Sequence, residues 1–302
     1  MRIGRFVGIL ILLLPLITAC AGMNRAPLTA DQRAITRELV ARTVVIQDEV
    51  IVQVAPDREV SAAVIGGAIG GAIGGALGGA LAAAVSADMT SQRAMETQKI
   101  AEKLYPAVEN VDFRSDIGKT VSKYLESYPL KVVQQETTAR AIDPFKMARH
   151  TKHLKPGQGL LTVVPTCMLS PDFRTLIVSL VSAIWVKDKE FDVYRGAMLY
   201  QSAAIGGSPA ESVTLWSEND GALFKKTLRE AIEELAQMML EDVDLDARLK
   251  AKPNATRTYT LANSFSVIRD IRQIEGQVVS EKSGRVRLLG TDGGYYSIPA
   301  KI

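Results

Sequence analysis

One stretch of the chain, residues 60–87, carries no charged residue and contains eight glycines in a four-residue repeat. The glycines form two rows of GxxxG spacing, Gly66, Gly70, Gly74 and Gly78 in one and Gly67, Gly71, Gly75 and Gly79 in the other. On a helix these rows make a strip without side chains, along which another backbone can approach closely. Because each glycine costs ~1 kcal/mol relative to alanine, the eight oppose an isolated helix in water by roughly 8 kcal/mol. A helix here therefore needs lipid or a tightly packed neighbour.

Two properties bear on whether this helix could enter a bilayer. A helix of 28 residues extends about 42 Å, more than the ~30 Å hydrocarbon core. Only eight of the 28 residues are Val, Ile or Leu, so insertion of a single helix would be marginal. The repeat resembles the glycine zippers of bacterial outer-membrane lipoproteins and surface antigens, and the resemblance implies self-association. A helix packed within its own chain and a flexible linker are the alternatives.

The first 19 residues have the architecture of a secretory signal. Arg2 and Arg5 give a basic start, and an apolar run follows at residues 6–17. Since a mature transmembrane helix needs ~20 apolar residues, we expect this segment to be cleaved. The sequence LITAC at residues 16–20 resembles the lipobox of bacterial lipoproteins, in which the cysteine receives a diacylglyceryl group and becomes the new N-terminus.

The lipobox resemblance implies that Cys20 carries acyl chains such as palmitate. At ~0.8 kcal/mol per buried methylene, several chains anchor a protein stably to a membrane. Ala21 follows the cysteine in place of the aspartate that retains such lipoproteins in the inner membrane. The resemblance therefore points to the periplasmic face of the outer membrane, and an ordinary secretory signal that contains a cysteine is the alternative.

Composition limits what the mature chain could bind. The chain has 36 Lys+Arg and 33 Asp+Glu, and removal of Arg2 and Arg5 leaves 34 against 33. A nucleic-acid-binding protein would show a basic excess, so we expect no nucleic-acid partner. A hydrophobic content of 47% is too high for a disordered chain, and 23% charged residues are too many for a polytopic membrane protein. Two cysteines exclude a disulfide framework.

The residue patterns predict no catalytic site, cofactor or metal. His150 and His153 are the only histidines, and no acidic or cysteine cluster supplies further metal ligands. Cys167 is expected to be a buried thiol rather than a nucleophile, and Trp185 and Trp216 are expected in the core. No P-loop, GxGxxG loop, Gly-x-Ser-x-Gly elbow or paired-carboxylate motif occurs.

Hydrophobic periodicity predicts an α+β fold. Its centre is an antiparallel three-stranded meander at residues 160–169, 176–186 and 192–203, covered by amphipathic helices. One of these helices, beginning at a cap formed by Ser217 and Asp220, has its apolar face at Phe224, Leu228, Ile232, Leu235, Met239 and Val243. A short helix is expected over residues 29–40. A Gly-rich helix precedes the meander and a small β subdomain follows it.

The predicted organisation has five parts. They are a signal peptide at 1–19, a tether with a short helix and strand at 20–59, the glycine-zipper helix and stalk at 60–105, an α+β periplasmic domain at 110–250 and the small β subdomain at 255–302.

These features predict a non-enzymatic outer-membrane lipoprotein that self-associates through the glycine-zipper helix and serves an assembly or structural role in the cell envelope. Its partners would be the membrane, further copies of itself and another envelope protein. The alternative is a periplasmic binding or transport-accessory lipoprotein in which the Gly-rich helix is a spacer. An envelope enzyme without a recognisable motif is a third hypothesis.

Overall fold

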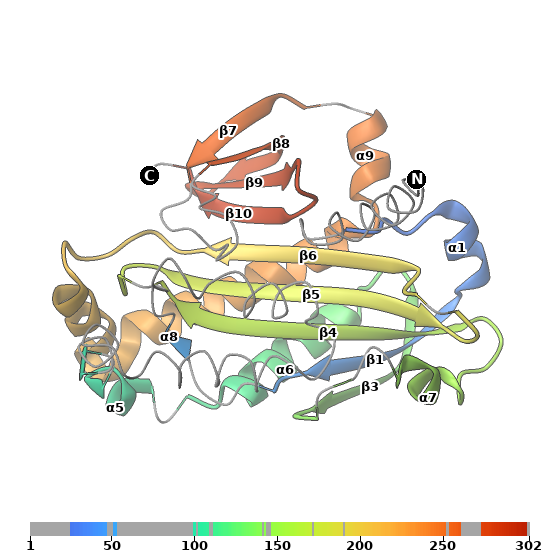
Figure 1. Cartoon of the computed structure of the whole chain (residues 1–302), viewed down its shortest axis with the longest axis horizontal. Helices are drawn as coiled ribbons and strands as arrows, with labels where there is room; N and C mark the ends of the chain where they lie inside the picture. Colours follow the sequence, from blue (N-terminus) through green and yellow to red (C-terminus); the bar gives the residue numbers. More distant parts are fainter. Residues whose placement is uncertain are drawn as a thin grey trace, which may run out of the picture.

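The computed structural model describes residues 25–46, 51–52, 99–100, 102–108, 111–140, 142, 146–170, 172–189, 191–251, 254–260 and 273–300. Their helices and strands, in chain order, are α1 (Ala30–Ile35), β1 (Glu38–Val44), β2 (Ile51–Val52), α5 (Tyr105–Val108), α6 (Phe113–Leu125), β3 (Lys131–Thr138), α7 (Met147–Thr151), β4 (Gln158–Leu169), β5 (Leu176–Val186), β6 (Tyr194–Gln201), α8 (Pro209–Asp242), α9 (Leu245–Ala251), β7 (Thr256–Thr260), β8 (Gln273–Lys282), β9 (Arg285–Gly290) and β10 (Tyr295–Pro299). In this part of the chain, ten strands form a mixed sheet in the order β3-β1-β4-β5-β6-β10-β9-β8-β7, with β2 also paired to β4 (Figure 1).

The predicted three-stranded meander with a separate β subdomain is wrong. β4, β5 and β6 do pair antiparallel, with Leu161 opposite Ile184 and Leu180 opposite Met198. The sheet, however, continues on both sides, because β1 adds to β4 and β10 adds to β6, each in parallel. The three predicted strands are therefore the middle of a larger mixed sheet, and the C-terminal strands extend that sheet.

The helix predicted over residues 29–40 is shorter, and a strand follows it. Thr29 caps α1 with a capping box: its side chain accepts from the Gln32 N–H, and the Gln32 side chain accepts from the Thr29 N–H. The helix ends at Ile35, and β1 begins at Glu38. β1 lies between β3 and β4, so both of its edges are hydrogen-bonded to strands that come later in the chain. Those distant partners favour a strand where the local pattern favoured a helix.

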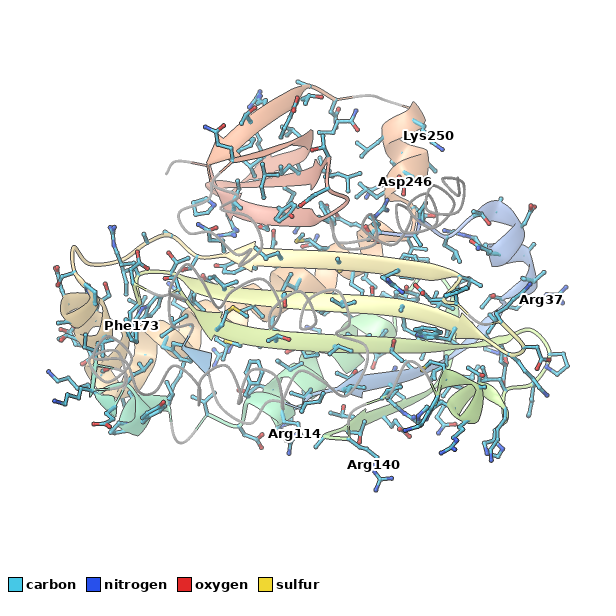
Figure 2. All side chains as sticks on the ribbon, viewed as in Figure 1. Arg37, Arg114, Arg140, Phe173, Asp246 and Lys250 are labelled. Carbon is cyan, nitrogen blue, oxygen red and sulfur yellow. The ribbon has the colours of Figure 1, made fainter. Side chains whose placement is uncertain are left out.

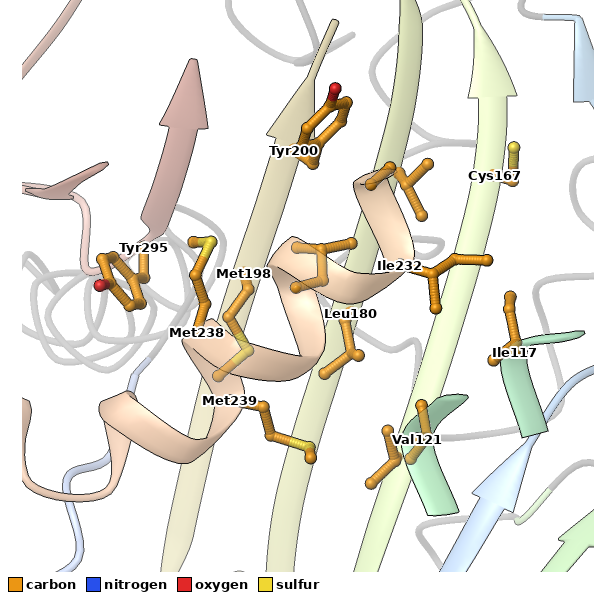
Figure 3. Close-up of a cluster of buried hydrophobic side chains, with 14 of the residues drawn as sticks. Ile117, Val121, Cys167, Leu180, Met198, Tyr200, Ile232, Met238, Met239 and Tyr295 are labelled. Atoms are coloured by element: carbon orange, nitrogen blue, oxygen red, sulfur yellow. The ribbon is translucent and has the colours of Figure 1, made fainter. Parts of the chain in front are cut away.

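The main core lies between one face of the sheet and helices α6 and α8. Figure 3 shows the side chains that meet there, Leu180 and Met198 from the strands, Ile232, Met238 and Met239 from α8, and Ile117 and Val121 from α6. The predicted apolar face of α8 is confirmed, since all six of its residues are buried. α8 begins earlier than predicted, at Pro209 with Ser208 as its cap, and the predicted cap at Ser217 is wrong because the Ser217 hydroxyl donates to the Val213 carbonyl at 2.6 Å. Helical geometry is instead interrupted within α8, where Asn219, Asp220 and Gly221 have positive φ.

The C-terminal strands share core and ion pairs with the rest of the sheet. Leu199 of β6 packs in one hydrophobic cluster with Leu288 of β9. The Arg287 guanidinium of β9 lies between two carboxylates of α8, 2.6 Å from Glu234 and 2.8 Å from Glu241. These contacts explain physically why the last strands are not a separate subdomain.

The Glu234 carboxylate makes the contact between α8 and β9 sensitive to acid. Burial acts to raise its pKa, but hydrogen bonds from Arg287 and Ser297 outweigh burial and lower the pKa below its ordinary value. Such a group adds stability above the ordinary glutamate pKa of about 4.3, and this stability is lost as the pH falls through the lowered pKa. We expect Glu234→Gln to weaken the dependence of the unfolding free energy on pH below about 4.3, as measured by denaturant titration at successive pH values.

The matched control for this prediction is Glu230→Gln. Glu230 lies one turn earlier on α8, is exposed, and forms a long ion pair of 3.9 Å with the exposed Lys226. Its substitution should leave the acid dependence as in the parent protein. The same acid dependence in the parent and Glu234→Gln proteins would contradict the role of Glu234.

Candidate functional site: the two ends of the sheet

The two ends of the central strands carry different parts of the chain (Figure 1). The anchor end consists of α1, the connection from α7 to β4 and the turn between β5 and β6. Backbone contacts hold these parts together: the Arg37 N–H donates to the Gly157 carbonyl at 2.8 Å, and Gly159 pairs with Val186. The insertion end consists of β2, the turn between β4 and β5, and α5. In Figure 2, Arg37 marks the anchor end and Phe173 the insertion end.

A buried ion-pair cluster fixes the chain just before α1. Arg25 Nε donates to Asp242 Oδ1 at 2.8 Å, and the same guanidinium contacts Asp246 and donates to the Asp242 carbonyl. The Arg25 side chain is 5% exposed and that of Asp242 is 0% exposed. Next to it, Ala26 exchanges two backbone hydrogen bonds with Arg195 at the start of β6, at 2.9 and 2.8 Å. We name these contacts of Arg25 and Ala26 the clamp.

The clamp continues into the core through Asp242. Tyr194 Oη donates to Asp242 Oδ2 at 2.7 Å and lies 3.3 Å from Ser182 Oγ. Burial raises the pKa of the Asp242 carboxyl, although Arg25 and the Tyr194 hydroxyl pull it down. Gly196 leaves the space for this group, because a Cβ there would lie 2.6 Å from Asp242 Oδ2. The arrangement holds the chain before α1 against the end of α8 and the start of β6.

The clamp lies close in sequence to the predicted lipid attachment point. Cys20 itself lies outside the described residues, and Arg25 follows it by five positions. At ~3.5 Å per residue, five residues span at most about 17 Å. Lipid attached at Cys20 would therefore hold the anchor end within about 17 Å of the membrane.

The eight predicted helix-packing glycines also lie outside the described residues, but the chain on both sides of them is described. Before them, β2 pairs with the last two residues of β4, at the insertion end. After them, the Lys103 carbonyl accepts from Ser217 Oγ at 3.2 Å, and α5 packs against α8. Gly221, with φ of 68°, makes this packing possible, since a Cβ there would lie 2.8 Å from the Ala107 carbonyl oxygen. The segment with the glycine repeat is thus joined to the domain at the end opposite the clamp.

A groove with apolar rims opens at the anchor end. It has a volume of about 370 Å³ and is lined by Asp31, Gln32, Ile35, Lys189, Phe191, Asp192 and Val193. Ile35 is 58% exposed and Phe191 is 71% exposed, more than any other large hydrophobic side chain of the described residues. Of its carboxylates, Asp192 forms a two-pronged ion pair with Arg195, at 2.9 and 2.6 Å. The groove therefore presents apolar surface next to charged side chains.

The histidines and Cys167 lie on different parts of the fold, His150 on α7, His153 just after it and Cys167 on β4. His150 Nδ1 lies 3.3 Å from Arg42 Nη1, and His153 is exposed. Cys167 is fully buried, and burial raises the pKa of its thiol far above the ordinary value. Trp185 and Trp216 are buried, which confirms their predicted place in the core. Across the described ranges, no group of three or more His, Cys, Asp or Glu side chains could hold a metal ion.

Sequence reasoning missed the clamp. Arg25 and Asp242 are separated by 217 positions, and no local pattern connects them. Asp242 and Asp246 are four positions apart, and this spacing is the one signal that the sequence offers for a shared cationic partner.

Comparison with known proteins gives no relative: no protein-family model matches the chain, and no curated protein is significantly similar to it. Within the part of the chain that the structure describes, no helix is both long enough and apolar enough to cross a membrane.

Proposed function

We propose that this protein is a non-enzymatic lipoprotein of the bacterial outer membrane, held at the periplasmic face by acyl chains on Cys20. Copies of the protein associate through the glycine repeat at residues 66–79. The assembly serves a structural or assembly role in the cell envelope, and it requires no cofactor.

The clamp is the observation that supports this proposal most strongly. A lipoprotein that searches for cargo benefits from a long flexible tether, which lets the domain move over a wide volume. Here a buried ion pair attaches the chain to the domain only five positions after Cys20. Such a short connection suits a protein that holds a defined position at the membrane surface.

The separation of the two ends supports self-association. β4 has 12 residues and runs from the anchor end to the insertion end, a distance of about 40 Å at ~3.3 Å per residue. The glycine repeat joins the domain at the insertion end, so membrane attachment at Cys20 leaves that end free to meet other copies. Tight backbone packing between like helices would compensate for the low helix propensity of the repeat.

Membrane attachment is tested by Cys20→Ser. We expect this variant to lose incorporation of labelled palmitate and to move from the membrane to the periplasmic fraction, because no acyl chain remains. Ala21→Asp is the matched control for location: it should keep the palmitate but move to the inner membrane. Unchanged acyl labelling of Cys20→Ser would contradict the proposed anchor.

Self-association is tested by Gly70→Leu combined with Gly74→Leu. Two leucines on one glycine row prevent close approach of backbones, so chemical cross-linking should no longer yield oligomers. Ile69→Leu combined with Ile73→Leu is the control, since it changes the same stretch and leaves both glycine rows intact. Oligomers of unchanged size in the glycine variant would contradict the zipper.

A further inference from the structure

We infer that the anchor end lies directly against an anionic phospholipid surface, with Ile35 and Phe191 in contact with lipid. This inference rests on the proposed function, because acylation of Cys20 is what brings the anchor end to the membrane. It adds that the folded domain itself binds the bilayer and so takes up one orientation on it.

The first argument is the position of exposed apolar side chains. Ile35 of α1 and Phe191 of the β5–β6 turn come from distant parts of the sequence but line the same groove. Both are more than half exposed, whereas no other large hydrophobic side chain of the described residues is more than 42% exposed. An aromatic and an aliphatic side chain projecting together from one end of a domain are typical of contact with the membrane interface.

The second argument is charge. Exposed basic residues occur on the connections at this end of the sheet: Arg37 between α1 and β1, Lys152 and Lys155 between α7 and β4, and Lys187 and Lys189 between β5 and β6. Against these five, α1 carries the exposed Asp31, the β5–β6 turn carries the exposed Asp188, and the sequence of that turn adds Glu190, so basic residues outnumber acidic ones by five to three. Phospholipid headgroups with negative charge attract such a cluster. A second copy of the same end would be repelled by it, which argues against a symmetric dimer here.

The third argument is reach. The clamp places Ala26 beside Arg195, and Phe191 precedes Arg195 by four positions. At ~3.5 Å per residue, Phe191 lies within about 14 Å of Arg195 along the chain. The five positions between Cys20 and Arg25 allow at most about 17 Å. The attachment point and the apolar side chains can therefore reach the same membrane surface without any change in the fold.

The experiment measures the depth of single labels in the acylated protein. Phe191→Cys and, separately, Leu223→Cys are labelled with an environment-sensitive fluorophore. Cys167 does not react because it is fully buried, and the thiol of Cys20 carries lipid. Leu223 is a matched exposed hydrophobic residue on α8, two positions after Gly221 at the insertion end. Each protein is placed in vesicles of phosphatidylethanolamine and phosphatidylglycerol that contain a lipid-borne quencher.

We expect the lipid quencher to act several-fold more strongly on the label at 191 than on the label at 223. Lys187→Gln and Lys189→Gln, each made separately, should shift the label at 191 away from lipid. The ratio of labels that contact lipid to labels that do not should fall about fivefold in each variant, since each lysine contributes ~1 kcal/mol near an anionic surface. It should also fall when phosphatidylcholine replaces the anionic lipid.

Three results would overturn the inference. Equal, weak quenching of both labels on vesicles that retain the protein would show that the anchor holds while the domain stands away from lipid. Quenching of the label at 191 that disappears when vesicles carry on average less than one protein each would show that the surface contacts a second copy of the protein and not lipid. Failure of the protein to stay on the vesicles would overturn the proposed lipid anchor itself, and the inference with it.

Discussion

Replacement of Asp242 by alanine is expected to lower the free energy of unfolding by about 3–5 kcal/mol, the usual cost of removing one partner from a buried ion pair. Asp242 accepts hydrogen bonds from Arg25 and Tyr194, and its side chain is fully buried. Its removal leaves the buried Arg25 guanidinium with only Asp246, which is 33% exposed, as its carboxylate partner, and it leaves the Tyr194 hydroxyl without its acceptor. Denaturant-induced unfolding, followed by tryptophan fluorescence, measures the effect. Proteases should also cleave the chain before α1 faster in limited proteolysis, because that segment loses the ion pair that attaches it to α8.

Asp244→Ala is the matched control for this prediction. Asp244 lies two positions away and pairs with Arg33, but the two side chains are 48% and 35% exposed. An exposed pair of this kind contributes at most about 1 kcal/mol. Asp242→Asn should have an intermediate effect, because burial raises the pKa of Asp242 and thus already disfavours its charged form. Equal losses for Asp242→Ala and Asp244→Ala would contradict the clamp.

Trp216→Ala is expected to cost a similar amount, about 3–5 kcal/mol, because it empties a large volume in the core. The indole of Trp216 packs edge-on against Phe224, with ring centroids 6.1 Å apart, and its Nε1 donates to the Phe173 carbonyl at 2.6 Å. Phe173 is buried with a φ of 58°, so this hydrogen bond holds the β4–β5 turn in a conformation that few residues adopt unaided. Hydrogen exchange of amides in α5 and in this turn should increase together with the loss of stability.

Two further variants separate packing from hydrogen bonding at this site. Trp216→Phe keeps most of the ring and leaves the Phe173 carbonyl without its donor, so we expect a loss of about 1–3 kcal/mol. Leu223→Ala, at an exposed position on the same helix, should change the unfolding free energy by no more than about 0.5 kcal/mol. A loss for Trp216→Ala as small as that for Leu223→Ala would contradict the role of the indole.

Local patterns located several elements but not their partners. The predicted strand at residues 176–186 coincides with β5, and the predicted apolar face of α8 is buried as expected. These predictions succeeded because burial of a strand or helix face leaves a period in the sequence. The parallel pairings of β1 with β4 and of β10 with β6 leave no such period, and for this reason the predicted fold class was wrong.

The predicted site residues, Cys20 and the eight glycines, lie outside the described part of the chain, and their roles stay predictions. The clamp could not be found in the sequence, because its charged partners are separated by more than 200 positions. The groove could not be found either, since an exposed Ile35 or Phe191 resembles any core residue until its surroundings are known.

The sequence by itself determined the uncharged glycine repeat, the lipobox-like pattern at Cys20 and the apolar periods of the central strands and of α8, because each depends on residues close together in the chain. Only the tertiary structure decided that the strands form a mixed sheet, that Arg25 is held by Asp242, and that the two ends of the domain carry the tether and the glycine insertion. The physical reason is that strand order, buried charge pairing and shared surfaces arise from contacts between distant segments, which are stable only once the whole core has formed.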